Sequence, residues 1–125
     1  MRAAFVIGLF VALFSVVLAL PTSNSKRGTN GRITFYTGDM LNAPACGGPA
    51  PTDEDMICAV PENSGHECGD RINLWHNGKT VTVTVRDKCA TCTEPNWFDL
   101  SKGAFSKLAD LDLGIVDDIV FWKDF

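Results

Sequence analysis

The sequence predicts a small all-β domain whose strands either close into a barrel or pack as a sandwich. Residues 80–85 alternate Thr with Val, which is typical of a strand with one buried and one solvent-facing side. Asn77-Gly78 precedes this run, and both residue types accept the positive φ angles that a two-residue hairpin turn needs. The other apolar runs are short and are separated by Gly- and Pro-containing loops. These observations favour several short strands over long helices.

Five or six short strands and one short helix are expected along the chain. The expected strands are residues 31–36, 56–60, 71–76, 79–86 and 119–122, and the longer loops are residues 38–55, 61–70 and 87–98. Ser101 can cap a helix over residues 102–109. Trp75 alternates with the apolar residues of its strand and is expected on the opposite face, whereas Trp122 is expected in the core.

The N-terminal 19 residues are predicted to be a secretory signal peptide. An almost wholly apolar run follows Arg2, and Val17-Leu18-Ala19 supplies the small or β-branched residues of a cleavage site. The alternative is a single membrane anchor, because the run is about long enough to span a bilayer. A secreted, extracellular protein that has no membrane contact after cleavage is the expected product.

Residues 20–30 are predicted to be a polar arm or propeptide, and residues 31–125 the folded domain. The arm contains Lys26-Arg27, a possible dibasic processing site with cleavage after Arg27. The alternative is that these two basic residues stay uncut and exposed to solvent.

The charge balance excludes some classes of partner. The chain has 11 basic and 15 acidic residues, a formal net charge of −4. Binding to nucleic acid or anionic lipid needs clustered Lys and Arg, so an acidic chain is a poor match for either partner. A polyanionic polysaccharide such as pectin is an equally poor match. A neutral polymer is the favoured partner, and we expect a monomer without a cofactor.

Five cysteines lie in the part of the chain that would be exported, where disulfides are expected. Cys58 lies in the apolar run Met-Ile-Cys-Ala-Val and is predicted to be the buried, unpaired one. The other four cysteines lie in loops, and three different pairings among them are possible. They are Cys46, Cys68, Cys89 and Cys92. The last two form a Cys-x-x-Cys motif that could be a redox pair or half a zinc site, but no second pair completes a site, so no metal is expected.

Several motifs resemble a known family. They are residues 83–89 (VTVRDKC), 97–101 (WFDLS) and 104–109 (AFSKLA), together with residues 33–36 (ITFY), 45–47 (ACG) and 68–69 (CG). The pattern is similar to rare-lipoprotein-A-like, expansin-related double-psi β-barrels, and most similar to the fungal single-domain loosenins. The resemblance covers roughly residues 31–122. It implies a six-stranded double-psi β-barrel of the barwin or expansin domain 1 type, with one or two short helices.

Asp99 is the candidate catalytic residue, with Asp87 in support. Asp99 stands between Phe98 and Leu100, and a carboxyl among apolar side chains has a raised pKa that suits a general acid. Asp87 could orient a sugar hydroxyl or Asp99 itself. The alternative is that each Asp caps a turn or a helix.

A hydrolytic pair of carboxylates is incomplete in this sequence. Inverting cleavage of a glycosidic bond needs a second carboxylate as base. Where the related barwin-type endoglucanases carry that base, this chain has Tyr36, and Asp39 lies three residues later in a loop. The resemblance to expansins therefore implies loosening without hydrolysis, and enzymatic activity stays uncertain.

Three further residues are predicted to contact sugar. Trp97 lies beside Asp99 and could be a stacking platform or a hydrophobic residue that covers a loop. Thr34 could offer a groove hydroxyl or be an ordinary strand residue, and Tyr36 could line the groove. His66 is a weak candidate for the histidine that related lytic transglycosylases use, because it does not align convincingly with that residue.

The sequence therefore predicts a secreted protein that binds and loosens cell-wall polysaccharide without hydrolysing it. One alternative is a secreted inhibitor or effector, for example an inhibitor of cysteine proteases. The other is a glycoside-cleaving enzyme that uses Asp99 as its general acid. The fold alone does not decide between these, because function depends on the groove and the loops.

Overall fold

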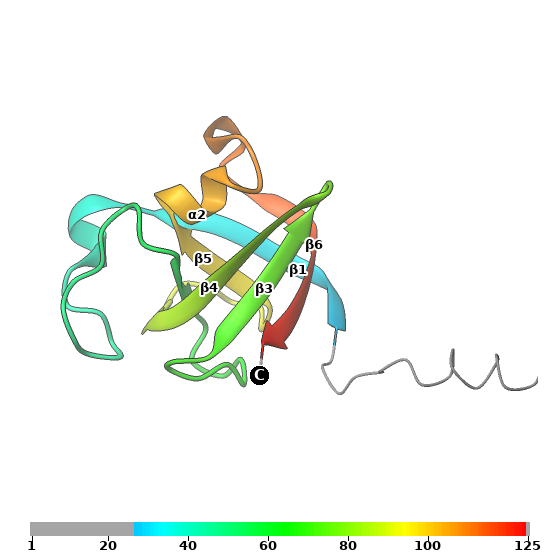
Figure 1. Ribbon diagram of the computed structural model, residues 1–125. Helices are drawn as coiled ribbons and strands as arrows, with labels where there is room; N and C mark the ends of the chain where they lie inside the picture. The colour runs from blue at the N-terminus through cyan, green and yellow to red at the C-terminus, as the bar shows by residue number, and fades with distance from the viewer. Residues whose placement is uncertain (1–26, 125) are drawn as a thin grey trace, which may run out of the picture.

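Six strands close into a barrel in the computed structural model, which describes residues 27–124 (Figure 1). The strands are β1 (Arg27–Tyr36), β2 (Ile57–Val60), β3 (Arg71–His76), β4 (Lys79–Lys88), β5 (Trp97–Ser101) and β6 (Val116–Asp124). Their order around the barrel is β1-β5-β2-β4-β3-β6. β1 pairs with β5, and β2 with β4, in parallel, while the other neighbours are antiparallel. The predicted all-β barrel is confirmed.

Short helices occupy the connections: η1 (Gly38–Leu41), α2 (Lys102–Ser106) and η2 (Leu111–Leu113). The Ser101 hydroxyl accepts a hydrogen bond from the Ala104 amide, so the predicted cap is present, although the helix ends three residues earlier than expected. The hairpin between β3 and β4 turns at Asn77 and Gly78, which both have the positive φ that the sequence predicts. No helix within residues 27–124 combines the length and the apolar character needed to span a bilayer.

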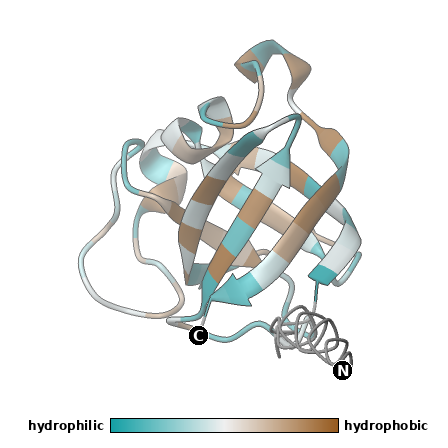
Figure 2. Ribbon diagram, turned by 45° about the vertical axis from the view of Figure 1, so that its right-hand side comes forward, coloured by the Kyte–Doolittle hydropathy of each residue, from teal (hydrophilic) through white to brown (hydrophobic). Residues whose placement is uncertain are grey.

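The interior of the barrel is filled from alternate residues of every strand. The fully buried side chains include Ile33, Cys58, Ile72, Leu74, Val83, Val85, Phe98, Leu100 and Ile119. Figure 2 shows the resulting bands of apolar and polar residues along the strands. In β4 the buried positions are the Val residues of the Thr-Val alternation, because a strand presents successive side chains to opposite faces.

Residue patterns alone do not predict β5, and they place residues 97–98 in a loop. The segment alternates Phe98 and Leu100, which are buried, with Trp97 and Asp99, which are half-buried. It is sandwiched between β1 and β2, so its hydrogen bonds go to residues far away in the chain. Local signals are weak for such a strand, since the polar residues that face outward look like loop residues.

β1 begins at Arg27, four residues before the predicted start of the domain. Residues 27 and 28 pair with β6, and a Cβ on Gly28 would collide with the Phe121 ring. The glycine is therefore part of the packing and not a sign of a loose arm. A cut after Arg27 stays a prediction, and the predicted signal peptide, residues 20–26 and Lys26 lie outside the described residues.

The core assignment of Trp122 was wrong. In β6 the side chains of Ile119 and Phe121 point inward, and Trp122 is half-buried on the outer face. The Arg27 guanidinium lies 4.6 Å from its ring centroid. The first residue of β1, which the sequence predicts to lie in a polar arm, thus covers one side of the indole.

The disulfides join Cys46 to Cys68 and Cys89 to Cys92. Cys58 is unpaired and fully buried. The first disulfide fastens the long loop after η1 to the loop before β3. The second closes a short loop directly after β4.

Candidate functional site

The candidate site is a row of residues on the outer face of four adjacent strands. Thr34 of β1 pairs with Asp99 of β5. Asp99 also pairs with Ala59 of β2, and Ala59 pairs with Asp87 of β4. Ile33, Phe98 and Cys58, the preceding residues of three of these strands, are fully buried in the barrel interior. The row therefore lies on the opposite face of the wall, with a small alanine between the two carboxylates.

Asp87 reaches this face through an irregularity in β4. Val81, Val83 and Val85 point inward, so strict alternation would send residue 87 inward as well. The pairing of β2 with β4 shifts by one residue between Cys58 and Ala59, which brings Asp87 opposite Ala59. A β-bulge that re-aims a side chain in this way is common beside functional sites.

Three side chains form a hydrogen-bonded relay at the Asp99 end of the row. The Trp97 indole Nε1 donates to Thr34 Oγ1 at 2.9 Å, and the Thr34 hydroxyl donates to Asp99 Oδ1 at 2.7 Å. Asp99 is half-buried, and burial raises its pKa. The charge of Asp87 adds to this rise, while the bond from Thr34 opposes it. The Asp99 carboxyl consequently holds its proton to a higher pH than an exposed aspartate does.

The Asp87 carboxylate is already engaged by the protein. Its Oδ1 accepts hydrogen bonds from the backbone amides of Ala45 at 2.8 Å and Lys88 at 2.9 Å. Its Oδ2 lies 3.5 Å from the Tyr36 hydroxyl, at the limit of a hydrogen bond. Ala45 lies next to Cys46, so the Cys46–Cys68 disulfide holds the donor in place. This set of contacts suits a residue that positions others.

Tyr36 forms part of the wall under the site. Its side chain is 6% exposed and packs in a second apolar cluster, which contains Tyr36, Leu41, Ile57, Ala59, Cys89 and Cys92. Burial and the nearby charges of Asp87 and Asp99 raise the pKa of the phenol. The hydroxyl therefore remains a donor, and the ring itself is too deeply buried to stack on a sugar.

Trp97 is half-buried, and its ring packs against the same cluster. The Arg32 guanidinium lies 5.0 Å from its ring centroid, and Arg32 is held there by Asp117, with 2.7 Å between Nε and Oδ1. The indole thus has a cation over one side and a hydrogen bond at its edge. Less of the ring is available for stacking than an exposed loop residue would offer.

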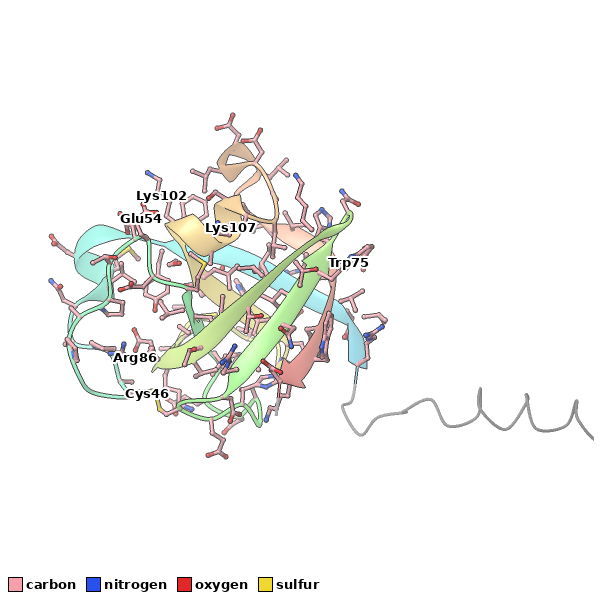
Figure 3. The ribbon with its side chains drawn as sticks, viewed as in Figure 1. Cys46, Glu54, Trp75, Arg86, Lys102 and Lys107 are labelled. Atoms are coloured by element: carbon pink, nitrogen blue, oxygen red, sulfur yellow. A yellow bond between two sulfur atoms is a disulfide. The ribbon has the colours of Figure 1, made fainter. Side chains whose placement is uncertain are left out.

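His66 and Trp75 lie away from the row. His66 packs against Phe98 and Phe121, with ring centroids 5.2 and 6.3 Å away, at the end of the barrel interior. Neither of its ring nitrogens has a hydrogen bond of good geometry within the described part of the chain. Burial lowers the pKa of the ring, and the nearby Asn96 side chain partly opposes this. Trp75 is 41% exposed on β3, on the side of the molecule opposite to Cys46 and Arg86 (Figure 3).

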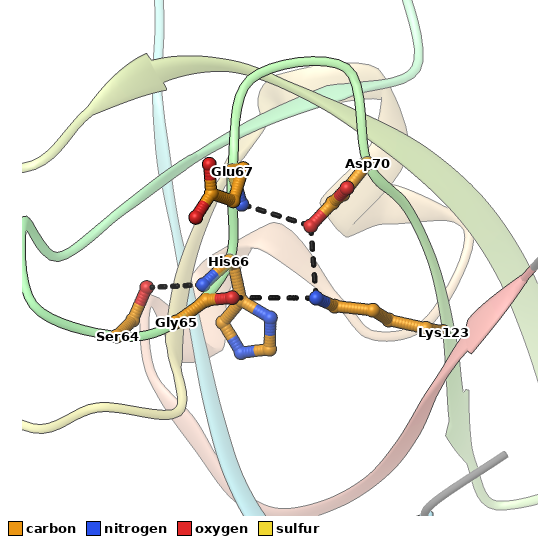
Figure 4. A network of polar contacts seen from close by, with 6 residues as sticks. All are labelled: Ser64, Gly65, His66, Glu67, Asp70 and Lys123. Carbon is orange, nitrogen blue, oxygen red and sulfur yellow. Dashed lines mark hydrogen bonds and ion pairs between the residues drawn. The ribbon is translucent and has the colours of Figure 1, made fainter.

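The loop that carries His66 is fastened by a lysine clamp (Figure 4). Lys123 Nζ lies 2.9 Å from Asp70 Oδ2 and donates to the Gly65 carbonyl at 3.3 Å. Asp70 Oδ2 also accepts from the Glu67 amide at 2.8 Å. These contacts hold the loop over the end of the barrel, so His66 serves packing there.

Sequence reasoning missed Ala59, the Ala45 amide and Arg32 as parts of the site. Each acts through a partner 28 or more positions away in the chain, and no local pattern marks such a pairing. Within residues 27–124, no three His, Cys, Asp or Glu side chains form a group that could hold a metal ion.

A family model described as "Lytic transglycolase" matches residues 29–120. The chain belongs to this family of double-psi β-barrels. The expected relation to rare-lipoprotein-A-like and expansin-related proteins is thereby confirmed, and the closed mixed barrel agrees with it.

Two kinds of relative are similar to the chain to a comparable degree. It is 37% identical over 102 residues to the papain inhibitor of Streptomyces mobaraensis, which covers 74% of this chain and 68% of the inhibitor. It is 32% identical over 128 residues to expansin-like protein 3 of Dictyostelium discoideum, which covers 92% of this chain and 38% of that protein.

Solved structures of the same two kinds of protein, an inhibitor and an expansin, are similar to the chain. A Streptomyces papain inhibitor superposes with a TM-score of 0.64 at 33% identity, covering 78% of this chain and 93% of the inhibitor. A mutant of the Clavibacter michiganensis expansin, in complex with cellohexaose, superposes with a TM-score of 0.65 at 31% identity, covering 80% of this chain and 51% of the expansin. The double-psi β-barrel is shared by an inhibitor and by an expansin, so similarity alone does not choose between their functions.

Proposed function

We propose that this protein is an extracellular, monomeric domain that binds a neutral cell-wall polysaccharide and loosens it without hydrolysis. The observation that carries the proposal is the relay from Trp97 through Thr34 to Asp99 on the outer wall. It leaves a half-buried carboxyl with a raised pKa, which can donate a hydrogen bond to a sugar hydroxyl when protonated and accept one when ionised. The related expansin bound to cellohexaose supports a polysaccharide as the partner.

The arrangement of the two carboxylates argues against hydrolysis. Inverting cleavage requires an acid and a base on opposite faces of the sugar, with room for a water molecule beside the base. Asp87 lies in the same row of the same wall as Asp99. Its Oδ1 is engaged by two backbone amides, so it is poorly placed to activate water.

The test is a mechanical assay on cellulose and chitin sheets, with soluble reducing sugar measured in the same samples. Asp99→Asn is expected to abolish weakening, and Asp112→Asn, a change at an exposed position of η2, is expected to leave it intact. Soluble sugar is expected to stay at background in all samples. Unchanged weakening by Asp99→Asn contradicts the proposal. Steady release of sugar that Asp99→Asn removes favours a glycoside-cleaving enzyme instead.

A second candidate function is inhibition of a cysteine protease. The papain inhibitor relative is matched over most of its length, and an exposed apolar turn offers a contact surface for a protein. In this turn Leu113 is 59% and Ile115 is 52% exposed, on either side of Gly114. The matched measurement is residual papain activity with the wild type and with Leu113→Asp. Strong inhibition that Leu113→Asp removes and Asp99→Asn retains would favour the inhibitor over the polysaccharide binder.

A further inference from the structure

A cavity of about 380 Å³ opens at one end of the wall that carries the candidate site. Two loops line it: the one after β2 and the one that joins β4 to β5. Its volume is within the range of sites that bind small molecules.

The buried and exposed residues of the cavity differ in chemistry. Pro61, Cys89 and Cys92 are buried and form an apolar floor, of which the Cys89–Cys92 disulfide is a part. The exposed residues around it include Glu62, Asn63, Thr93 and Glu94, and no Lys or Arg lines the cavity. An apolar floor with hydroxyl, amide and carboxylate groups at its rim suits a pyranose ring, which has an apolar face and a belt of hydroxyls.

The cavity lies beside the outer row of the candidate site, beyond the last residues of β2 and β4 and the first residue of β5. Pro95 lines it two residues before Trp97, and Cys89 lines it two residues after Asp87. Pro61 directly follows β2, which carries Ala59. Because a strand advances about 3.3 Å per residue, Trp97 stands only about 7 Å along β5 from Asp99, on the way to the cavity.

The disulfide connects the two places physically. Cys89 and Cys92 belong to the same buried cluster as Tyr36 and Ala59, and Trp97 packs against this cluster. The floor of the cavity and the wall under Asp99 are therefore one packed unit. A polymer chain that contacts Asp99 and runs along β5 toward its first residue would pass Trp97 and enter the cavity.

We propose that this cavity is a second sugar subsite, which binds a pyranose residue of the same neutral chain that contacts Asp99. The proposal rests on the proposed function for its polymer. It adds that affinity depends on the length of the chain, and that Glu62 and Glu94 repel polymers of uronic acids.

The test is a calorimetric titration of the full domain with hexasaccharides of glucose and of N-acetylglucosamine. Ala90→Trp places a large side chain at an exposed position of the cavity, and it is expected to weaken binding at least about tenfold, a factor that corresponds to about 1.4 kcal/mol. Ala50→Trp, at an exposed position outside the cavity, is the matched control and is expected to keep wild-type affinity. Asn63→Ala, which removes a rim amide, is expected to weaken binding by a smaller factor.

The outcomes separate this subsite from the proposed function. Wild-type affinity in both Ala90→Trp and Asn63→Ala overturns the subsite, even if Asp99→Asn abolishes wall weakening. Failure of the wild type to bind either hexasaccharide overturns the subsite and the proposed function together. A loss of affinity in Ala90→Trp without any effect of Asp99→Asn on weakening supports the subsite and contradicts the role of Asp99.

The charge of the rim has its own measurement. The double variant Glu62→Gln, Glu94→Gln is expected to bind a hexamer of galacturonic acid several-fold more tightly than the wild type does, and to gain more affinity for this acidic hexamer than for the neutral hexasaccharide. No gain for the acidic hexamer would show that these carboxylates do not select against uronic acids.

Discussion

The inner and outer faces of β5 carry different kinds of residue for different purposes. Phe98 and Leu100 point inward and are fully buried, with Phe98 5.2 Å from the Phe121 ring. Trp97 and Asp99 alternate with them on the outer face and join the relay to Thr34. Residues adjacent in sequence thus serve either the stability of the barrel or the chemistry of its surface, since each strand has two faces.

The outer face accepts an arrangement that the inner face excludes. Burial raises the pKa of the Asp99 carboxyl, so its charged form destabilises the fold. The packed interior beneath it offsets this free-energy cost. If this division holds, substitutions inside should affect stability first, and substitutions outside should affect the site first.

The largest expected effect is on the inner face. Phe98→Ala should lower the free energy of unfolding by about 3–5 kcal/mol, because it removes a fully buried ring and leaves a cavity. Urea denaturation measures the loss. Trp75→Ala, which truncates an aromatic side chain that is 41% exposed, is the control and should cost much less. Equal losses in the two variants would remove the distinction between interior and surface.

The two disulfides provide the next comparison. Replacing Cys46 and Cys68 by Ser should cost about 3 kcal/mol, whereas replacing Cys89 and Cys92 should cost about 2 kcal/mol, because the second loop is much shorter. The first change should also weaken the hold of Ala45 on Asp87 and so reduce wall weakening beyond what the stability loss explains. Thermal melts of the two double variants, run beside the mechanical assay, measure both losses. A larger loss of stability in the variant without Cys89 and Cys92 would contradict the prediction.

The barrel was predictable wherever one residue pattern could specify a strand. The Thr-Val alternation and Asn77-Gly78 define β4 and its hairpin, because side-chain period and turn geometry are local properties. β5 lacked such a pattern, and its strand character comes from pairing with β1 and β2. Trp122 was misplaced for a related reason: the inward positions of β6 are taken by Ile119 and Phe121.

The site was predictable in its residue types and not in its connections. Thr34, Asp87, Trp97 and Asp99 could be selected by motif, and the structure places all four on one wall. The relay joins residues 65 positions apart, and the bulge that turns Asp87 outward is visible only in the register. The ring of Tyr36 is buried, and residue patterns do not predict this because they do not give the position of the covering loop.

A smaller effect concerns His66, which packs under the clamped loop. Burial holds its folded-state pKa below the unfolded value, so the unfolded chain binds more protons as the pH falls. The stability that the neutral ring contributes should be present above about pH 6.5 and decline below it. His66→Leu should flatten this part of the profile in denaturation at pH 7 and at pH 5.5. An unchanged profile would show that other groups govern acid stability.

The smallest effect has the opposite sign and concerns Asp99. Its folded-state pKa is raised, so its favourable contribution is present below the unfolded value of about 3.9 and is lost as the pH rises through the folded value. Asp99→Asn, whose amide oxygen can still accept from Thr34, should therefore be slightly more stable than the wild type at pH 7 and not at pH 3. A thermal shift at the two pH values measures this. A lower melting temperature at pH 7 would contradict a desolvated charge at this position.

Cys58 has a consequence for how the protein must be made. Its thiol is sealed inside the barrel behind the outer row, and burial raises its pKa, so hardly any thiolate exists in the native state. Exchange with either disulfide needs that thiolate. Scrambled isomers can therefore arise only before the barrel closes, which makes the order of strand assembly and oxidation decide the yield of correctly bridged protein.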